Sequence, residues 1–242
     1  MELWFRWWMG LKRILSFGGG LQTTAMAILV AQGKLQIDEA VFADTGAEKP
    51  DTYSYMENYT KQILPVTILP AVNGGLKAYC EKYRIIPSVI DKWCTIRFKI
   101  EPLNKYCGDA VQLIGFSTDE IRRSENPKLE GKEFPLIEMG ISSADCVHII
   151  RDYGFPIPLK SSCYFCSSQR MTEWNWLKIH HKDLFTDALR LENMLYERKP
   201  EYKERTGLLM GKPLWKHAEG IQQEMPMLSE KEYSCWSGHC GH

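Results

Sequence analysis

The sequence lacks a net charge and a long apolar run, and each absence narrows the class of protein. Its 30 basic and 30 acidic side chains balance, so a nucleic-acid partner would need a local basic patch. No uncharged stretch reaches the roughly 20 residues that cross a bilayer. The N-terminus also lacks an apolar core followed by a small-residue cleavage site. We therefore expect a soluble, cytoplasmic protein with no membrane partner.

Cysteine is too sparse for a disulfide framework, since eight occur among 242 residues. In the cytosol these thiols would stay reduced, so grouped cysteines favour metal or redox chemistry. The length suits one large α/β domain, or one such domain with a smaller lobe.

Short apolar runs alternate with helix-forming segments along the chain. The predicted strands are residues 14–17, 39–44, 66–69, 110–116 and 135–138. The predicted helices are residues 22–32, 50–64 and 171–198, with a further helix from a capping box at Ser142 and Asp145 to about residue 153. This alternation predicts a Rossmann-like α/β fold, a parallel sheet of about five strands flanked by helices, with ligands beyond the carboxyl ends of the strands.

Changes in composition predict three parts. Residues 1–12 form an aromatic arm with three tryptophans, 13–154 a nucleotide-binding domain, and 155–242 a helical lobe with a cysteine-bearing tail. The arm either packs on the domain or on a partner subunit of a homodimer, or offers a membrane-surface or base-stacking platform.

The segment Ser16–Thr24, Ser-Phe-Gly-Gly-Gly-Leu-Gln-Thr-Thr, joins the first predicted strand to a helix. Consecutive glycine N–H groups at a helix N-terminus can bind an anion. The segment matches neither the dinucleotide fingerprint nor the P-loop, so phosphate binding and a purely steric turn stay equally open. At the end of the second strand, Asp44 offers an acceptor for ribose or adenine, before a glycine turn and a helix begun by Pro50.

Together, this loop and Asp44-Thr-Gly-x-x-x-Pro-x-Thr-Tyr53 resemble the phosphoadenosine-phosphosulfate reductase family of the PP-loop ATP pyrophosphatases, a resemblance that covers residues 13–170. It implies that the loop binds the phosphates or the sulfate-bearing end of ATP or an adenylylated sulfate. The implied phosphate contacts are Ser16, Gly18, Gly19, Gly20, Gln22 and Thr23, and the residues implied near the nucleoside are Asp44 and Thr45.

A third segment, from Gly115 to Arg123, is similar to the family's Gly-x-Arg-Arg segment after the fourth strand. Gly115, Arg122 and Arg123 are therefore candidate nucleotide-binding residues. The two arginines would pair with phosphate or sulfate, and the alternative is that they are solvated surface arginines.

The cysteines at 163 and 166 form a Cys-x-x-Cys pair, a spacing that suits zinc, an iron–sulfur cluster or a dithiol. Cys94 lies in a stretch that resembles the Cys-Cys-x-x-Arg-Lys-x-x-Pro-Leu stretch of adenylylsulfate reductases with a [4Fe–4S] cluster. Trp93 stands where that stretch has its first cysteine, and one residue is inserted between Arg97 and Lys99. These segments supply three cysteines, so either another cysteine completes the site or one iron is left open.

The tail offers Cys235 and Cys240, and it loosely resembles the Glu-Cys-Gly-Leu-His end of the reductases. We assign Cys235 to sulfur chemistry as the catalytic thiol, and Cys240 to the cluster with Cys94, Cys163 and Cys166. Lys160, just before Cys163, is a second catalytic candidate because its charge would stabilise negative charge on a nucleotide or on thiolates. An ordinary solvated lysine is the equally open alternative.

The resemblance implies adenine-nucleotide-dependent sulfur chemistry at an iron–sulfur site, with zinc as the alternative metal. Either a thiol reduces an adenylylated sulfate, or ATP activates an acceptor for sulfur insertion. Expected partners are the nucleotide, a thiol electron donor or sulfur-donor protein, and a nucleic-acid substrate for the insertion reaction. A nucleotide-binding accessory subunit without catalysis, in a nucleic-acid-modifying or defence complex, is the alternative from another class.

Overall fold

The computed structural model describes residues 10–218, which contain one parallel four-stranded sheet in the order β3-β2-β1-β4. The strands are β1 (Arg13–Ser16), β2 (Glu39–Ala43), β3 (Val66–Leu69) and β4 (Val111–Leu113). The chain adds β2 and β3 on one side of β1 and then returns to place β4 on the other side. The carboxyl ends of β1 and β4 therefore flank a topological switch point, where open α/β sheets bind their ligands.

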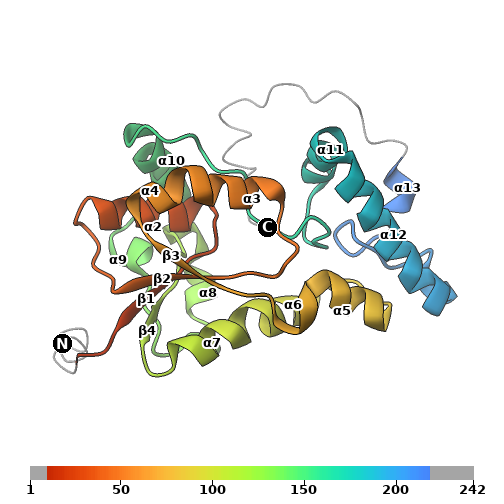
Figure 1. Cartoon of the computed structure of the whole chain (residues 1–242), viewed down its shortest axis with the longest axis horizontal. Coiled ribbons are helices and arrows are strands. Elements are labelled where there is room, and N and C mark those ends of the chain that lie inside the picture. The colour runs from red at the N-terminus through yellow and green to blue at the C-terminus, as the bar shows by residue number, and fades with distance from the viewer. Residues whose placement is uncertain (1–9, 219–242) are drawn as a thin grey trace.

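Both faces of the sheet are buried, which explains why its strands are apolar rather than alternating. Leu15, Ala40 and Phe42 face one core, whereas Ile14 and Val41 face a second, smaller one with Cys107. Figure 1 shows α2, α3 and α10 above the sheet and α7 below it.

Helices follow each strand of the sheet. Those before β4 are α2 (Leu21–Ala31), α3 (Pro50–Tyr55), α4 (Lys61–Ile63), α5 (Gly75–Tyr83), α6 (Trp93–Thr95) and α7 (Glu101–Cys107). The π-helical turns Met56–Thr60 and Ile96–Ile100 join α3 to α4 and α6 to α7. Those after β4 are α8 (Ile121–Ser124), α9 (Pro135–Glu138), α10 (Ser143–Asp152), α11 (Met171–His180), α12 (Lys182–Arg198) and α13 (Trp215–Ala218).

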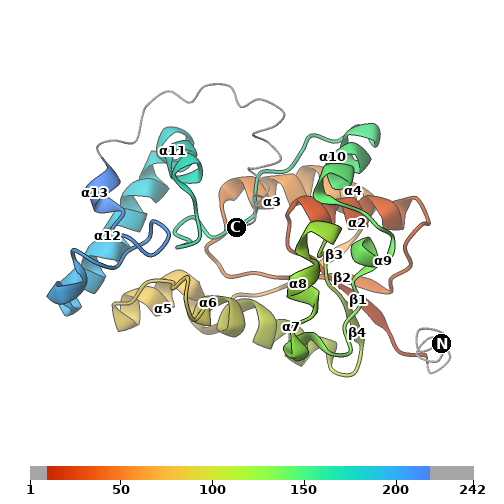
Figure 2. The same ribbon diagram turned by 180° about the vertical axis from the view of Figure 1, so that it is seen from behind.

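A separate hydrophobic core lies beside the sheet domain. Its buried members include Phe165 and Trp174 from the C-terminal half and Leu76, Cys80 and Phe98 from before β4. Seen from behind, α5 lies beneath α12, and α6 continues from α5 toward α7 (Figure 2). The boundary at residue 154 stays a prediction, but α5 and α6 share their core with the C-terminal helices.

Four of the five predicted strands are confirmed, and so is the capping box of Ser142 and Asp145. The prediction of a fifth strand at residues 135–138 is wrong, because Pro135 cannot donate to a ladder and instead begins α9. The sheet gains only a single bridge there, between Leu113 and Glu133. The helix predicted for residues 171–198 is interrupted at His181, whose φ of −140° and ψ of 64° are not helical.

Some of the predictions fall outside the described residues. They concern most of the tryptophan-rich arm, together with Cys235 and Cys240 in the tail. Between residues 10 and 218, no helix combines the length and the apolarity needed to span a bilayer.

Candidate functional site

The glycine loop leaves β1 and begins α2 in the manner expected of an anion site. The N–H group of Gly18 donates to Thr23 Oγ1 at 3.3 Å, and that hydroxyl lies 3.3 Å from the carbonyl oxygen of Gly20. Gly20 provides no side-chain cap, and the first turn of α2 holds no acidic residue, so its partial positive charge is not offset locally. The hydroxyl of Ser16 is buried and has no hydrogen-bond partner among residues 10–218.

Other segments pack so closely against this loop that a Cβ atom at two of its glycines would overlap with them. A Cβ atom at Gly19 would lie 2.8 Å from Thr52 Cγ2, and one at Gly20 would lie 3.0 Å from Ser161 Oγ. At the end of β4, a Cβ atom at Gly115 would lie 2.9 Å from Thr23 Cγ2. The loop is thus enclosed by the start of α3, the segment around Ser161 and the end of β4.

Asp44 is held in a fixed position at the carboxyl end of β2. Its Oδ1 accepts hydrogen bonds from the N–H of Gly46 at 2.7 Å and from the hydroxyl of Tyr53 at 2.6 Å. Burial, followed by the bond to Asp44, raises the pKa of Tyr53 well above its ordinary value, so this hydroxyl stays a donor. The role of Asp44 near the nucleoside stays a prediction. The hydrogen bond from Tyr53 holds the carboxylate of Asp44 in place.

A short antiparallel bridge ties the Cys-x-x-Cys segment to the chain after β2. Tyr164 N–H donates to the carbonyl of Ala47 at 2.9 Å, and Lys49 N–H donates to the carbonyl of Ser162 at 3.1 Å. This pairing places the buried Thr45 hydroxyl 3.2 Å from the sulfur of Cys163. The side chain of Thr45 therefore faces the cysteine, and its predicted place near the nucleoside stays a prediction.

An ion pair between the buried Glu48 and the partly exposed Lys99 lies beside Cys163. Lys99 Nζ lies 2.6 Å from Glu48 Oε1, and the same oxygen is 3.7 Å from the Cys163 sulfur. Burial and then the Glu48 charge raise the pKa of Cys163, while Lys99 opposes them. Burial and Glu48 thus disfavour the thiolate form of Cys163, and Lys99 favours it.

The three predicted cysteine ligands share one neighbourhood. Cys94 and Cys166 are half-buried against the core that contains Cys163. Burial raises the pKa of Cys94, and the charge of Cys166 adds to this effect. The donor type fits an iron–sulfur cluster or zinc, but within residues 10–218 no three His, Cys, Asp or Glu side chains are grouped closely enough to hold a metal ion.

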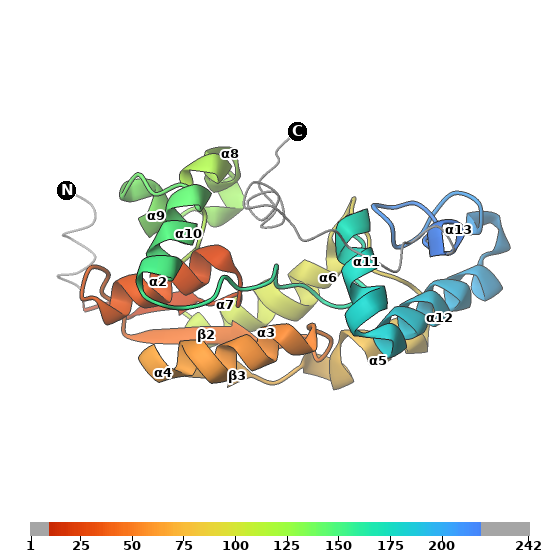
Figure 3. The same ribbon diagram turned by 90° about the horizontal axis from the view of Figure 1, so that it is seen from above.

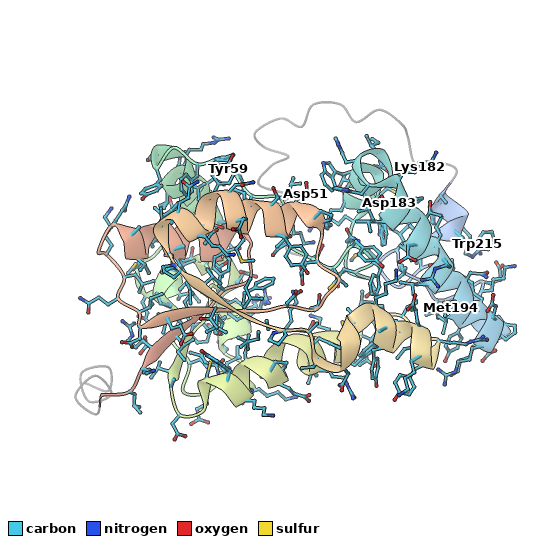
Figure 4. The ribbon with its side chains drawn as sticks, viewed as in Figure 1. Asp51, Tyr59, Lys182, Asp183, Met194 and Trp215 are labelled. Atoms are coloured by element: carbon cyan, nitrogen blue, oxygen red, sulfur yellow. The ribbon has the colours of Figure 1, made fainter. Side chains whose placement is uncertain are left out.

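Lys160 and the start of α3 meet at a buried carboxylate. Lys160 Nζ lies 3.1 Å from Glu173 Oε2, and Lys49 Nζ lies 3.7 Å from Glu173 Oε1. Two residues after Lys49, Asp51 contacts His181 Nε2 at 2.9 Å, which fastens α3 to the junction of α11 and α12. Figure 4 shows Asp51 at the end of α3 that faces Lys182 and Asp183.

The two predicted arginines lie on α8, after the carboxyl end of β4. Both are exposed, and Arg123 pairs with Glu120 and covers the ring of Phe116 at 4.2 Å. Seen from above, α8 lies close to α9 and α10 (Figure 3). Pairing of Arg122 and Arg123 with phosphate stays a prediction.

Several residues of this site could not be predicted from the sequence. Glu48 and Lys49 occupy unassigned positions of the Asp44–Tyr53 motif, and Ser161 stands in a plain polar run. Glu173 and Lys99 meet their partners only through tertiary packing.

The chain is similar to a family model, to a relative in sequence and to solved structures. The family model described as the phosphoadenosine phosphosulfate reductase domain matches residues 12–142. An uncharacterized protein of Methanocaldococcus jannaschii is 30% identical over 112 residues, which are 46% of this chain and 26% of that protein. The chain thus spans about a quarter of this relative's length. The crystal structure of phosphoadenylyl-sulfate reductase from Candida auris, a phosphate complex, matches with a TM-score of 0.49 and 18% identity over 64% of this chain and 79% of that one.

The family match covers more than half of the 242 residues, and it includes the glycine loop, the Asp44 motif and both arginines. The chain belongs to the phosphoadenosine phosphosulfate reductase family of PP-loop proteins.

Proposed function

We propose that this chain performs adenine-nucleotide-dependent sulfur chemistry, with the nucleotide at the glycine loop and the sulfur at the cysteines. The observation that supports this most directly is the course of residues 160–166. Ser161 lies against Gly19 and Gly20, and two residues later Cys163 contacts Thr45. One short segment therefore adjoins both the loop that would hold phosphate and the thiols that would handle sulfur.

In this proposal the loop and the start of α2 bind the phosphate, and Asp44 and Tyr53 position the nucleoside. Lys160 offsets negative charge that develops on the leaving group. The side chain of Lys160 is 26% exposed, and its ammonium lies 3.1 Å from Glu173 Oε2, so the charge stays accessible to a bound anion.

Two reactions agree with this arrangement. In the first, a thiolate, for which Cys235 is our candidate, attacks the sulfur of an adenylylated sulfate, and the nucleoside phosphate leaves as its S–O bond breaks. A second thiol then displaces sulfite and forms a disulfide, which a thiol electron donor reduces. In the second, ATP adenylates an acceptor with release of pyrophosphate, and a sulfur nucleophile displaces AMP.

An assay of the anaerobic protein with ATP and with adenylylated sulfates separates these reactions. Sulfite formed from an adenylylated sulfate supports reduction, and pyrophosphate with AMP formed from ATP supports acceptor activation. Nucleotide binding without turnover supports the accessory-subunit alternative. If no adenine nucleotide binds, the proposed function is wrong.

We further propose that Cys94, Cys163 and Cys166 hold a [4Fe–4S] cluster, with Cys240 as the fourth ligand or with one iron open. A bound cluster would supply electrons or labile sulfide beside the nucleotide. Anaerobically purified protein should then contain about four iron and four sulfide per chain. Cys94→Ser should lower the iron content, whereas Cys107→Ser, in the separate small core with Ile14 and Val41, should not. Zinc in place of iron would overturn the cluster and leave a zinc site.

A further inference from the structure

Positive charge gathers on the segment between the end of α12 and α13. Residues 198–217 carry six basic side chains and two acidic ones, in a chain whose totals balance. The basic side chains are Arg198, Lys199, Lys203, Arg205, Lys212 and Lys216, and all but Lys199 are exposed. A chain without net charge needs such a local patch to bind a polyanion.

The protein neutralises little of this charge itself. Of the two acids, Glu204 pairs with Lys216 at 2.5 Å. The side chains of Arg205 and Lys212 pair with no carboxylate between residues 10 and 218. These two cations are therefore available to an external anion, and hydrogen bonds between charged groups are the stronger kind.

An exposed tryptophan lies among these charges. The ring of Trp215, the first residue of α13, is 40% exposed. The ammonium groups of Lys203 and Lys216 lie 5.6 and 5.8 Å from its centre. Residues on both sides of Lys203, 200–202 and 204–206, line a hollow of about 420 Å³. An aromatic face beside cations is the combination that binds the bases and phosphates of a single strand.

The indole of Trp215 is held in place although it is exposed. The carboxylate of Glu192 is fully buried and accepts hydrogen bonds from three N–H groups of the segment. They belong to Leu208, Leu214 and Trp215, at 2.8, 2.7 and 3.0 Å. The indole N–H donates to the carbonyl oxygen of Lys203 at 3.2 Å. Because the ring is already ordered, a base that stacks on it costs little additional conformational entropy.

We propose that the basic surface of residues 198–217 binds single-stranded nucleic acid, with phosphates at Arg205 and Lys212 and a base stacked on Trp215. Figure 4 shows Trp215 on the side of the molecule away from the sheet, so this surface is separate from the glycine loop. The inference goes beyond the proposed function and does not depend on it. Where both hold, the acceptor in the ATP-dependent reaction is a nucleic acid.

Fluorescence anisotropy with a labelled strand of about 16 nucleotides tests the surface in the full chain, with no other nucleotide present. RNA and DNA of the same sequence are compared, and the tighter one identifies the kind of strand. Arg205→Gln combined with Lys212→Gln should lower the slope of log affinity against log salt by about 1.4, since each phosphate contact contributes about 0.7. Lys34→Gln combined with Lys105→Gln removes two exposed charges from the sheet domain and should leave the slope unchanged.

The stacking on Trp215 has its own test. Trp215→Leu should weaken binding of the strand by about tenfold, and Trp215→Phe should restore most of the affinity. Affinity for heparin, a polyanion without bases, should stay within about twofold in Trp215→Leu. An equal loss for heparin would mean that the ring supports the fold of the segment and does not stack on a base.

Three results would overturn the surface: no binding of either strand at low salt, equal effects of the two double variants, or displacement of the strand by AMP. The last would place the strand at the glycine loop. If Trp215→Leu does not fold, the salt slopes of the double variants decide, because their side chains are exposed and make no ion pair in the described part of the chain. Failure of the strand to bind leaves the binding of adenine nucleotides, and with it the proposed function, unaffected.

Discussion

At the scale of single residues, Gly19 combines two requirements that only glycine meets. Its φ of +69° lies in the left-handed region, and a Cβ atom would lie 2.8 Å from Thr52 Cγ2. Gly33, just after α2, shares the conformation, with a φ of +72°, but no atom lies within 4 Å of its Cβ position. Alanine substitutions at Gly19 and Gly33 therefore separate the cost of backbone strain from the cost of steric overlap.

Gly19→Ala should lower the free energy of unfolding by about 2–4 kcal/mol, because strain of about 1 kcal/mol adds to the overlap with α3. Gly33→Ala should cost about 1 kcal/mol from strain alone. Urea denaturation measures both, and calorimetry with AMP should show weaker binding for Gly19→Ala only. Equal losses of stability would mean that Thr52 can move aside without a cost in free energy.

At the scale of elements, the strands and helices with a clear period were predictable from the sequence. The runs that became β1, β2 and β3 are apolar and followed by helix formers, so local preference and burial agree. The predictions of secondary structure were wrong where tertiary contacts or a single proline determine the local conformation. Residues 135–138 are apolar enough for a strand, but Pro135 favours a helix start, and the break at His181 accompanies its contact with Asp51.

The π-helical turn at Ile96–Ile100 coincides with the residue inserted between Arg97 and Lys99. A π-turn absorbs one extra residue without rotating the helix on either side of it. Trp93, upstream of the turn, packs on Tyr79, and Lys99, within the turn, pairs with Glu48.

Deleting Ile96, which is 42% exposed, should convert this turn to regular α-helix and leave the chain folded. Deleting the exposed Lys105 from the regular helix α7 should instead rotate Cys107 out of its core by about 100°, since an α-helix has 3.6 residues per turn. Thermal unfolding compares the two deletions. A larger fall in Tm for the Ile96 deletion would show that the π-turn is itself required.

Helix α10 carries a pH-dependent cap. Asp145 Oδ2 accepts from the N–H and hydroxyl of Ser142, at 2.8 and 2.6 Å, and the hydroxyl bond chiefly lowers the pKa of Asp145. Because the folded pKa lies below the unfolded value of about 3.9, the stabilisation is present above that value and is lost as pH falls through the folded pKa.

Asp145→Asn should therefore cost about 1 kcal/mol at pH 7 and progressively less below about pH 4. Urea denaturation across this range measures the difference from the wild type. The exposed Asp109→Asn provides the control and should show no such trend. If the loss of unfolding free energy in Asp145→Asn stayed constant at acidic pH, the cap would depend on hydrogen-bond geometry rather than on the charge of Asp145.

At the scale of the whole molecule, the sheet made half of the site predictable. Parallel strands end at one edge, so the glycine loop after β1 and Asp44 after β2 had to be neighbours. The other half depends on how the C-terminal segment returns to the sheet. The bridge between Glu48 and Cys163 joins residues far apart in the chain, and no local pattern specifies it.

This return segment should respond to a nucleotide bound at the glycine loop. Because Ser161 packs on Gly20, a ligand that orders the loop also restrains the bridge in which Tyr164 N–H bonds to Ala47. Hydrogen exchange followed by mass spectrometry should show that AMP slows exchange at residues 160–166 as well as 18–24. Helix α7, on the opposite face of the sheet, should exchange unchanged, and guanosine 5′-monophosphate should have less effect than AMP. Protection confined to residues 18–24 would mean that the nucleotide and the cysteines are adjacent but not coupled.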